Sequence, residues 1–119
     1  KKFNDDNDVA IIEIEESQSI FIPNIQPKLP NVLDKIIVIG SPLGEQNVTT
    51  NGVVSKIVND DSLLDETFIQ MTAPISAGNS GGPVFNEKRE IIGITVAYQE
   101  GAQNMNYAIP AKYIKRLLE

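Results

Sequence analysis

The sequence predicts an all-β domain, an antiparallel β-barrel or sandwich followed by one C-terminal helix. Short runs rich in Val, Ile, Thr and aromatic residues recur at roughly regular spacing, with turn residues between them. A different pattern follows them, because residues 111–118 place apolar side chains on one face at helical spacing and basic side chains outside. Pro110 suits the start of that helix, since it fixes φ and needs no backbone donor there.

The predicted strands follow one another along the chain with polar connections between them. They comprise residues 9–14, 35–39, 48–58, 67–71, 84–85, 91–98 and 104–109. Asn51-Gly52 interrupts the longest run, and we expect a bend or a bulge there. The polar residues 86–90 predict a hairpin turn. Residues 15–34 contain three prolines and are therefore expected to connect elements rather than to form regular structure.

The composition sets limits on function. At 119 residues the chain has the length of one domain, and 41% hydrophobic residues suffice for one core. A net charge of −6 argues against nucleic acid or an anionic membrane as a partner. The sequence has no apolar run long enough to predict insertion into a membrane. The chain contains neither cysteine nor histidine, and we expect no metal site and no cofactor.

The stretch Gly78-Asn79-Ser80-Gly81-Gly82-Pro83, the serine loop, has the clearest chemical meaning. Its glycines permit positive φ and close approach of a second molecule, and the proline fixes the chain as it leaves the turn. Such a loop exposes a hydroxyl and directs backbone N–H groups at one point, as a serine nucleophile with an oxyanion hole requires. The G-x-S-x-G elbow of α/β-hydrolases leads into a helix, which Gly-Gly-Pro does not begin. A plain glycine-rich turn is the alternative without chemistry.

Further stretches accompany the serine loop in a fixed order. They are Asn7-Asp8-Val9-Ala10-Ile11-Ile12, Val38-Ile39-Gly40-Ser41-Pro42-Leu43-Gly44, Thr50-Asn51-Gly52-Val53-Val54-Ser55, Phe68-Ile69-Gln70, Ile92-Gly93-Ile94 and Tyr107-Ala108-Ile109-Pro110. Together with the loop they resemble the C-terminal half of a trypsin-like (chymotrypsin-fold) serine protease, and most closely the HtrA/Deg group. The match covers nearly the whole chain.

The resemblance implies a division of the chain into three parts. Residues 1–14 would be the aspartate-bearing strand left from an N-terminal barrel, residues 15–34 an inter-barrel linker, and residues 35–119 the six-stranded C-terminal β-barrel with its terminal helix. The strand at residues 9–14 would then lack most of its partners. We expect it to be disordered, to fold back on the barrel or to pair with a second copy.

The resemblance also implies roles for individual residues. Ser80 takes the position of the nucleophile. The N–H groups of Gly78 and Ser80 would form the oxyanion hole, and Asn79 would shape the loop between them. Asp8 takes the position of the aspartate that orients the catalytic histidine. Taken alone, Asp8 would be read as a solvated turn residue, like the other acidic residues beside it.

A substrate pocket follows from the same resemblance. Pro74 stands where enzymes selective for Arg or Lys carry a carboxylate, so we expect a preference for small or aliphatic side chains before the cleaved bond. The backbone near Thr95 would pair with the substrate as an added strand. The pocket walls would come from two segments, Ile94, Thr95 and Val96 on one side and Asn106, Tyr107 and Ala108 on the other. Barrel core is the alternative for these residues, above all for Ile94.

The chain lacks the third member of the triad. The family's histidine lies upstream, in the N-terminal barrel, and this chain contains none. A serine without a base is a weak nucleophile at neutral pH, so we expect an inactive piece of a serine endopeptidase. The alternative is a protease-like domain that binds peptides or acts as a scaffold. The implied partners are a polypeptide substrate, the missing N-terminal barrel and, as in trimeric relatives, further copies. The implied compartment is the cell envelope, the periplasm or the exterior.

Overall fold

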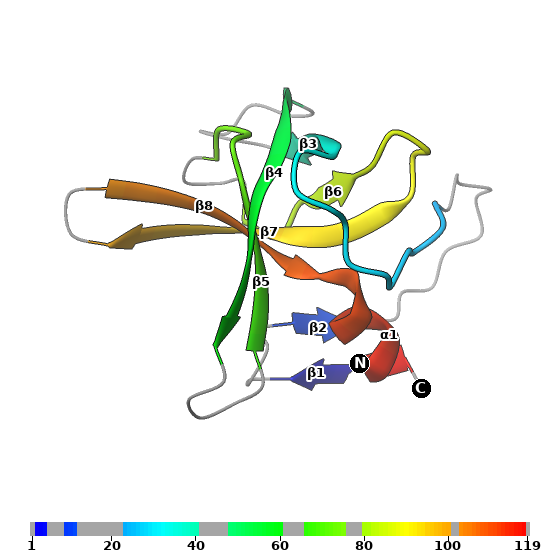
Figure 1. Cartoon of the computed structure of the whole chain (residues 1–119). Helices are drawn as coiled ribbons and strands as arrows, with labels where there is room; N and C mark the ends of the chain where they lie inside the picture. The colour runs from blue at the N-terminus through cyan, green and yellow to red at the C-terminus, as the bar shows by residue number, and fades with distance from the viewer. Residues whose placement is uncertain are drawn as a thin grey trace.

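A computed structural model describes residues 2–4, 9–11, 23–40, 48–60, 66–75, 80–100 and 103–118. In this part of the chain, strands β3 to β8 form a closed antiparallel barrel, and the helix α1 (Ala111–Leu118) follows the last strand (Figure 1). The predicted fold class is confirmed. The closure also decides between the barrel and the sandwich.

The barrel is built from the strands that the sequence predicts. They are β3 (Lys35–Gly40), β4 (Val48–Asp60), β5 (Glu66–Met71), β6 (Pro83–Phe85), β7 (Ile91–Glu100) and β8 (Gln103–Pro110). Around the barrel they follow the order β3-β4-β5-β8-β7-β6, and the pairing of β6 with β3 closes the ring. Beyond the barrel, β7 and β8 continue as a two-stranded ribbon (Figure 1).

Alternating side chains fill the barrel interior. In β3, Ile36 and Val38 are each 1% exposed, whereas Lys35 and Ile37 face solvent. Every barrel strand contributes to the same buried cluster, which consists of Ile36, Val38, Val54, Ile69, Met71, Ala73, Val84, Ile92 and Ala108. Burying one large aliphatic side chain stabilises a fold by about 1.5–3 kcal/mol, so this cluster holds the strands in one barrel.

Helix α1 packs on the barrel through a second apolar cluster. Ile109 and Tyr113 are its buried residues, and partly buried side chains from β5, β7 and α1 surround them: Phe68, Ile94, Val96, Ile114 and Leu117. The backbone N–H of Thr67 donates a hydrogen bond of 2.9 Å to the Tyr113 hydroxyl. This bond ties α1 to the start of β5.

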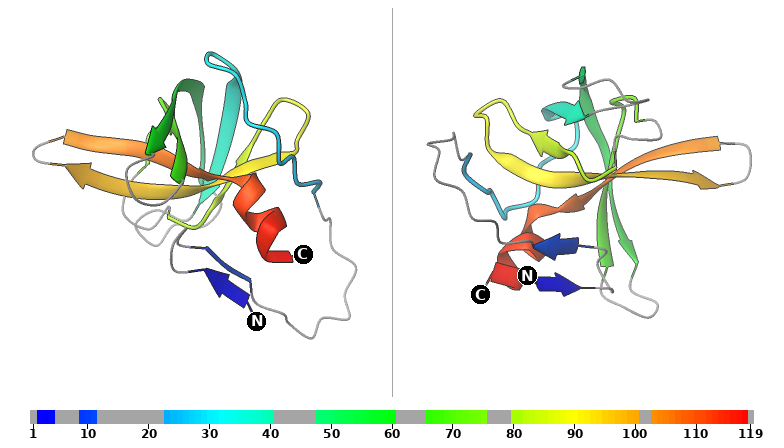
Figure 2. Two further views of the ribbon diagram at one scale, coloured as in Figure 1. Left: turned by 60° about the horizontal axis from the view of Figure 1, so that its bottom comes forward. Right: turned by 180° about the vertical axis from the view of Figure 1, so that it is seen from behind.

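Two short strands near the N-terminus lie against α1. β1 (Lys2–Asn4) and β2 (Val9–Ile11) pair antiparallel and contact the helix (Figure 2). The sequence predicts β2 but not β1, because three residues without strand periodicity give no signal. The described part of the predicted strand at residues 9–14 thus folds back within the chain, and residues 12–14 lie outside the described residues.

One irregularity of the barrel differs from its predicted place. The pairing of β3 with β4 runs without a break through Asn51 and Gly52, where we expected a bend or bulge. The register shift lies instead between Val54 and Lys56, in the pairing with β5. Gly52 serves close packing, since a Cβ there would lie 2.5 Å from the backbone nitrogen of Ala73.

The described part of the predicted linker, residues 23–34, is fastened to the barrel at both ends. Near its start, the backbone of Ile91 donates to the Asn24 carbonyl and accepts from the Gln26 N–H, both at 2.8 Å. Near its end, the Leu33 N–H donates to the Val54 carbonyl at 2.7 Å. Within the described residues, no helix has the length and apolar character that crossing a membrane would require.

Candidate active site

Ser80 lies in an exposed turn just before β6. Gly81 follows it with φ at +91°, a conformation that residues with a side chain rarely adopt. Apart from Gly81 and its two chain neighbours, no heavy atom of the described residues lies within 4 Å of the place where a Gly81 Cβ would be. The glycine is therefore required by the backbone conformation and not by lack of space.

Beyond Ser80 the chain is held by Thr95 of β7. The Gly81 N–H donates to the Thr95 carbonyl, and the Thr95 N–H donates to the Gly82 carbonyl, both at 2.9 Å. The Thr95 hydroxyl accepts a hydrogen bond from the Gly82 N–H at 3.1 Å and donates to the Gly82 carbonyl at 3.3 Å. Backbone and side chain of one residue thus fasten the two glycines that follow the serine.

Ahead of the serine loop the chain is held by β4. The Thr72 N–H donates to the Val53 carbonyl at 3.0 Å, and the Thr72 hydroxyl accepts from the Val53 N–H at 2.9 Å. The Thr50 hydroxyl donates to the Pro74 carbonyl at 3.3 Å. Gly52 permits this approach, because a Cβ there would lie 2.5 Å from the Thr72 hydroxyl oxygen. Strand β4 therefore directs the chain as it leaves β5.

The residues predicted to form the substrate pocket lie at neighbouring positions of β7 and β8: Ile94, Thr95, Val96, Asn106, Tyr107 and Ala108. The side chains of Ile94 and Val96 pack in the second apolar cluster beside α1. The Tyr107 ring lies 6.0 Å from the Phe68 ring, measured between centroids. The backbone of Thr95 in β7 is hydrogen-bonded to Gly81 and Gly82 and therefore lies beside the serine loop. A role of the side chains of these six residues in lining a substrate pocket stays a prediction.

The remaining predicted site residues divide into two groups. Pro74 is described, and it is exposed on the segment that leads from β5 toward the serine loop. Three others lie outside the described residues, namely Asp8, Gly78 and Asn79. The proposed oxyanion hole and the orienting aspartate therefore stay predictions.

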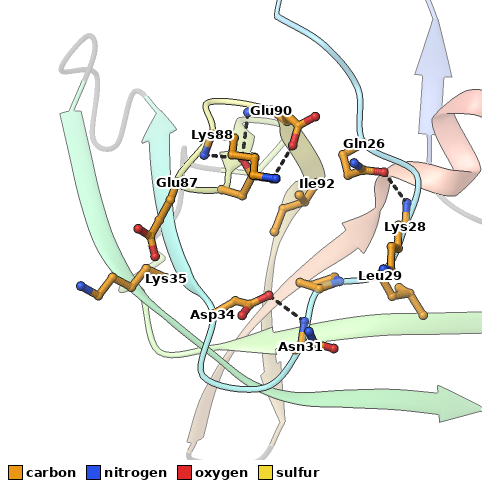
Figure 3. Close-up of a pocket in the computed structure, with 12 residues that line it drawn as sticks. Gln26, Lys28, Leu29, Asn31, Asp34, Lys35, Glu87, Lys88, Glu90 and Ile92 are labelled. Carbon is orange, nitrogen blue, oxygen red and sulfur yellow. Dashed lines mark hydrogen bonds between the residues drawn. The ribbon is translucent and has the colours of Figure 1, made fainter.

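A separate concavity lies between the linker and the turn joining β6 to β7 (Figure 3). It measures about 650 Å³, and its charged lining residues carry both signs: Lys28, Lys35, Lys88, Asp34, Glu87 and Glu90. Local hydrogen bonds engage some of these carboxylates, as between the Asn31 N–H and Asp34 at 2.8 Å. The Asn86 side-chain amide donates to Glu90 at 3.0 Å. Ser80 does not line this concavity, which is therefore not part of the candidate site.

Comparison with known proteins assigns the family. Residues 2–94 match the family model described as a trypsin-like peptidase domain. The chain belongs to this family. Its curated relatives include the putative serine protease HhoB of Synechocystis sp., 33% identical over 117 residues that cover 94% of this chain and 28% of that protein. A probable periplasmic serine endoprotease DegP-like of Chlamydia trachomatis is 35% identical over 117 residues, with 94% and 24% covered.

The solved structures agree with the sequence relatives of this trypsin-like peptidase domain. The HtrA-type protease AlgW, as a serine-to-alanine variant with a tripeptide, superposes with a TM-score of 0.75 at 25% identity, covering 89% of this chain and 37% of that one. The resemblance to HtrA/Deg proteases is therefore confirmed. The chain spans less than a third of the length of these two curated relatives.

The fastening of the serine loop was not predicted. The hydrogen bonds of the Thr72 and Thr95 hydroxyls and the packing role of Gly52 are seen only in the structure. A signal existed for Thr95, which is a polar residue in the otherwise apolar run Ile-Ile-Gly-Ile-Thr-Val. A hydroxyl in such a strand is expected to be buried and therefore to need a hydrogen-bond partner.

Proposed function

We propose that the chain is the serine-bearing part of a serine endopeptidase that cleaves polypeptides through an acyl-enzyme on Ser80. The observation that carries the proposal is an exposed serine in a chain of the trypsin-like peptidase family, followed by two glycines that Thr95 holds, the first of them left-handed. Relatives of the chain are named serine endoproteases, and one solved neighbour was obtained with a tripeptide.

The proposed reaction is acyl transfer in two stages. The Ser80 hydroxyl oxygen attacks the carbonyl carbon of the peptide bond, and its proton passes to a base. The C–N bond then breaks, the amine leaves with that proton, and the acyl group stays on the serine oxygen. Water next attacks the acyl group, releases the new carboxyl end and restores the serine hydroxyl. Backbone N–H groups of Gly78 and Ser80 are proposed to bind the oxyanion.

The base is proposed to come from outside these 119 residues, which contain no histidine. Asp8 would orient that histidine, and the polypeptide carrying it would be the N-terminal barrel that completes the site. Without the base only the oxyanion hole and substrate binding remain, which give about 10³–10⁴-fold acceleration over water at best. The 119-residue chain is therefore expected to cleave no protein by itself. Association of several copies is a further proposal by analogy with the HtrA/Deg group.

An assay of cleavage with and without the upstream polypeptide tests the proposal. The chain and its S80A variant are each incubated with casein and with a peptide library, alone and joined to the segment that the reading frame encodes before Lys1. We expect cleavage that depends on Ser80 in the joined form only, and after small or aliphatic residues because Pro74 replaces a carboxylate. Equal cleavage by the wild type and S80A would contradict the role of Ser80.

The absence of histidine favours a second candidate, a protease-like domain that binds peptides without chemistry. The two candidates differ in the joined form. An upstream segment without histidine, together with peptide binding that S80A leaves unchanged, would support the binding module. A histidine-bearing joined form with casein cleavage excludes it.

A further inference from the structure

Thr95 is one of two buried polar residues among those whose side chains the structure describes. It is 1% exposed, and Thr67 is 3% exposed. A hydroxyl buried in a barrel is unfavourable unless it is hydrogen-bonded, and valine has nearly the same shape without that requirement. The hydroxyl of Thr95 is therefore explained by the bonds it makes and not by the space it fills.

Those bonds go to the backbone of Gly82, two residues after Ser80. The Gly82 N–H donates to the Thr95 hydroxyl at 3.1 Å, and the hydroxyl donates to the Gly82 carbonyl at 3.3 Å. Gly81 and Gly82 have no side chains that could anchor them, and glycine is the residue with the most backbone freedom. Contacts from β7 to the main chain are thus the means by which this stretch is fixed.

We infer that Thr95 is a positioning residue, whose hydroxyl holds Gly82 and thereby fixes the direction in which the Ser80 oxygen points. The inference rests on the proposed function. The resemblance implied that the Thr95 side chain lines the substrate pocket. In the inference proposed here, the side chain instead acts from inside the barrel, behind the serine loop. Accuracy of about 1 Å in the placement of a reacting group can change a rate about 100-fold, so a single bond two residues away has a measurable effect on catalysis.

Three substitutions separate positioning from packing. T95V keeps the shape and removes the hydroxyl, T95S keeps the hydroxyl and removes the methyl group, and T67V is the matched control. Thr67 is the other buried threonine, and its hydroxyl bonds Asn59 at 2.9 Å at the α1 end of β5. T67V therefore loses a buried hydroxyl away from the serine loop.

The activity measurement uses the histidine-bearing form of the protein and a peptide substrate. T95V is expected to lower kcat about 10- to 100-fold with little change in KM, whereas T95S and T67V stay close to the wild type. If Thr95 instead lined the substrate pocket, the opposite pattern would be expected. T95V would keep the shape of the pocket and its activity, whereas T95S would change the preferred substrate residue. A T95V enzyme with wild-type kcat overturns the inference. If T95V does not fold, T95A takes its place with the same expectation.

Amide hydrogen exchange in the 119-residue chain gives a readout that does not need activity. In T95V the Gly82 amide is expected to exchange at least about 10-fold faster than in the wild type, since it loses its acceptor. The Gly81 amide, bonded to the Thr95 carbonyl, serves as the internal control and keeps its protection. Unchanged protection at Gly82 overturns the inference. In the activity assay of the histidine-bearing form, an inactive wild type contradicts the proposed function, whereas an active wild type with a fully active T95V contradicts this inference alone.

Discussion

At Gly52 one added methyl group would reach the backbone that leads into the serine loop. A Cβ there would lie 2.5 Å from the Ala73 nitrogen and 2.9 Å from the Ala73 Cα, so the collision involves main chain that cannot rotate away. G52A is expected to lower the free energy of unfolding by about 2–3 kcal/mol, the upper part of the range for overpacking. Denaturation with urea measures the change.

Gly81 provides the comparison for G52A. Its Cβ would enter open space, so G81A suffers only from the left-handed conformation, at a cost of about 1 kcal/mol. If G52A proved as stable as G81A or more so, the close approach of β4 to the segment after β5 would not hold in solution.

Residues near the serine loop differ in how well the sequence reveals them. Ser80 and Gly81 belong to one local motif, so their exposed turn and positive φ could be predicted from adjacent letters. The bonds of Thr72 to Val53 and of Thr95 to Gly82 join residues 19 and 13 positions apart. They depend on the register between strands, which single residues do not encode.

The attachment of α1 to the barrel depends on a buried hydrogen bond as well as on the apolar face of the helix. The Thr67 N–H is buried and donates to the Tyr113 hydroxyl at 2.9 Å. Y113F keeps the ring in the second apolar cluster and removes the acceptor, which leaves a buried donor unsatisfied. We expect a loss of about 1–3 kcal/mol in the free energy of unfolding, measured by thermal or urea denaturation.

A substitution on the exposed face of the same helix is the control for Y113F. Arg116 is exposed and lies over the Tyr113 ring, with the guanidinium carbon 5.2 Å from the ring centroid. R116A removes this cation–π contact, which at an exposed site stabilises by about 0.5–1 kcal/mol. A Y113F variant no less stable than R116A would show that the apolar face alone holds α1.

The elements themselves were predictable where periodicity is strong. The buried and exposed residues of β3 alternate as a half-buried strand requires, and α1 spans the residues that the helical spacing indicates. β1 could not be predicted, because its three residues are set by pairing with β2 and contact with α1. The bulge predicted at Gly52 was wrong for a similar reason. The glycine is needed there because Thr72 and Ala73 pack against it, and not because the strand is irregular.

The whole chain contains no histidine and yet is proposed to carry the nucleophile of a protease. Strand β4 holds Thr72 and Pro74 ahead of the serine loop, β7 holds Gly82 after Ser80, and the barrel that these strands belong to is closed. A serine hydroxyl becomes an effective nucleophile at neutral pH when a base accepts its proton. The serine and its proton acceptor are therefore proposed to come from different parts of the polypeptide.

Labelling of Ser80 by a fluorophosphonate, followed by mass spectrometry of the peptide that contains it, tests whether a histidine from outside the 119 residues activates this serine. We expect an adduct on Ser80 that forms at least about 1000-fold faster in the histidine-bearing form than in the 119-residue chain, as loss of a triad member implies. Equal labelling rates in the two forms, or an adduct at any other residue, would contradict it.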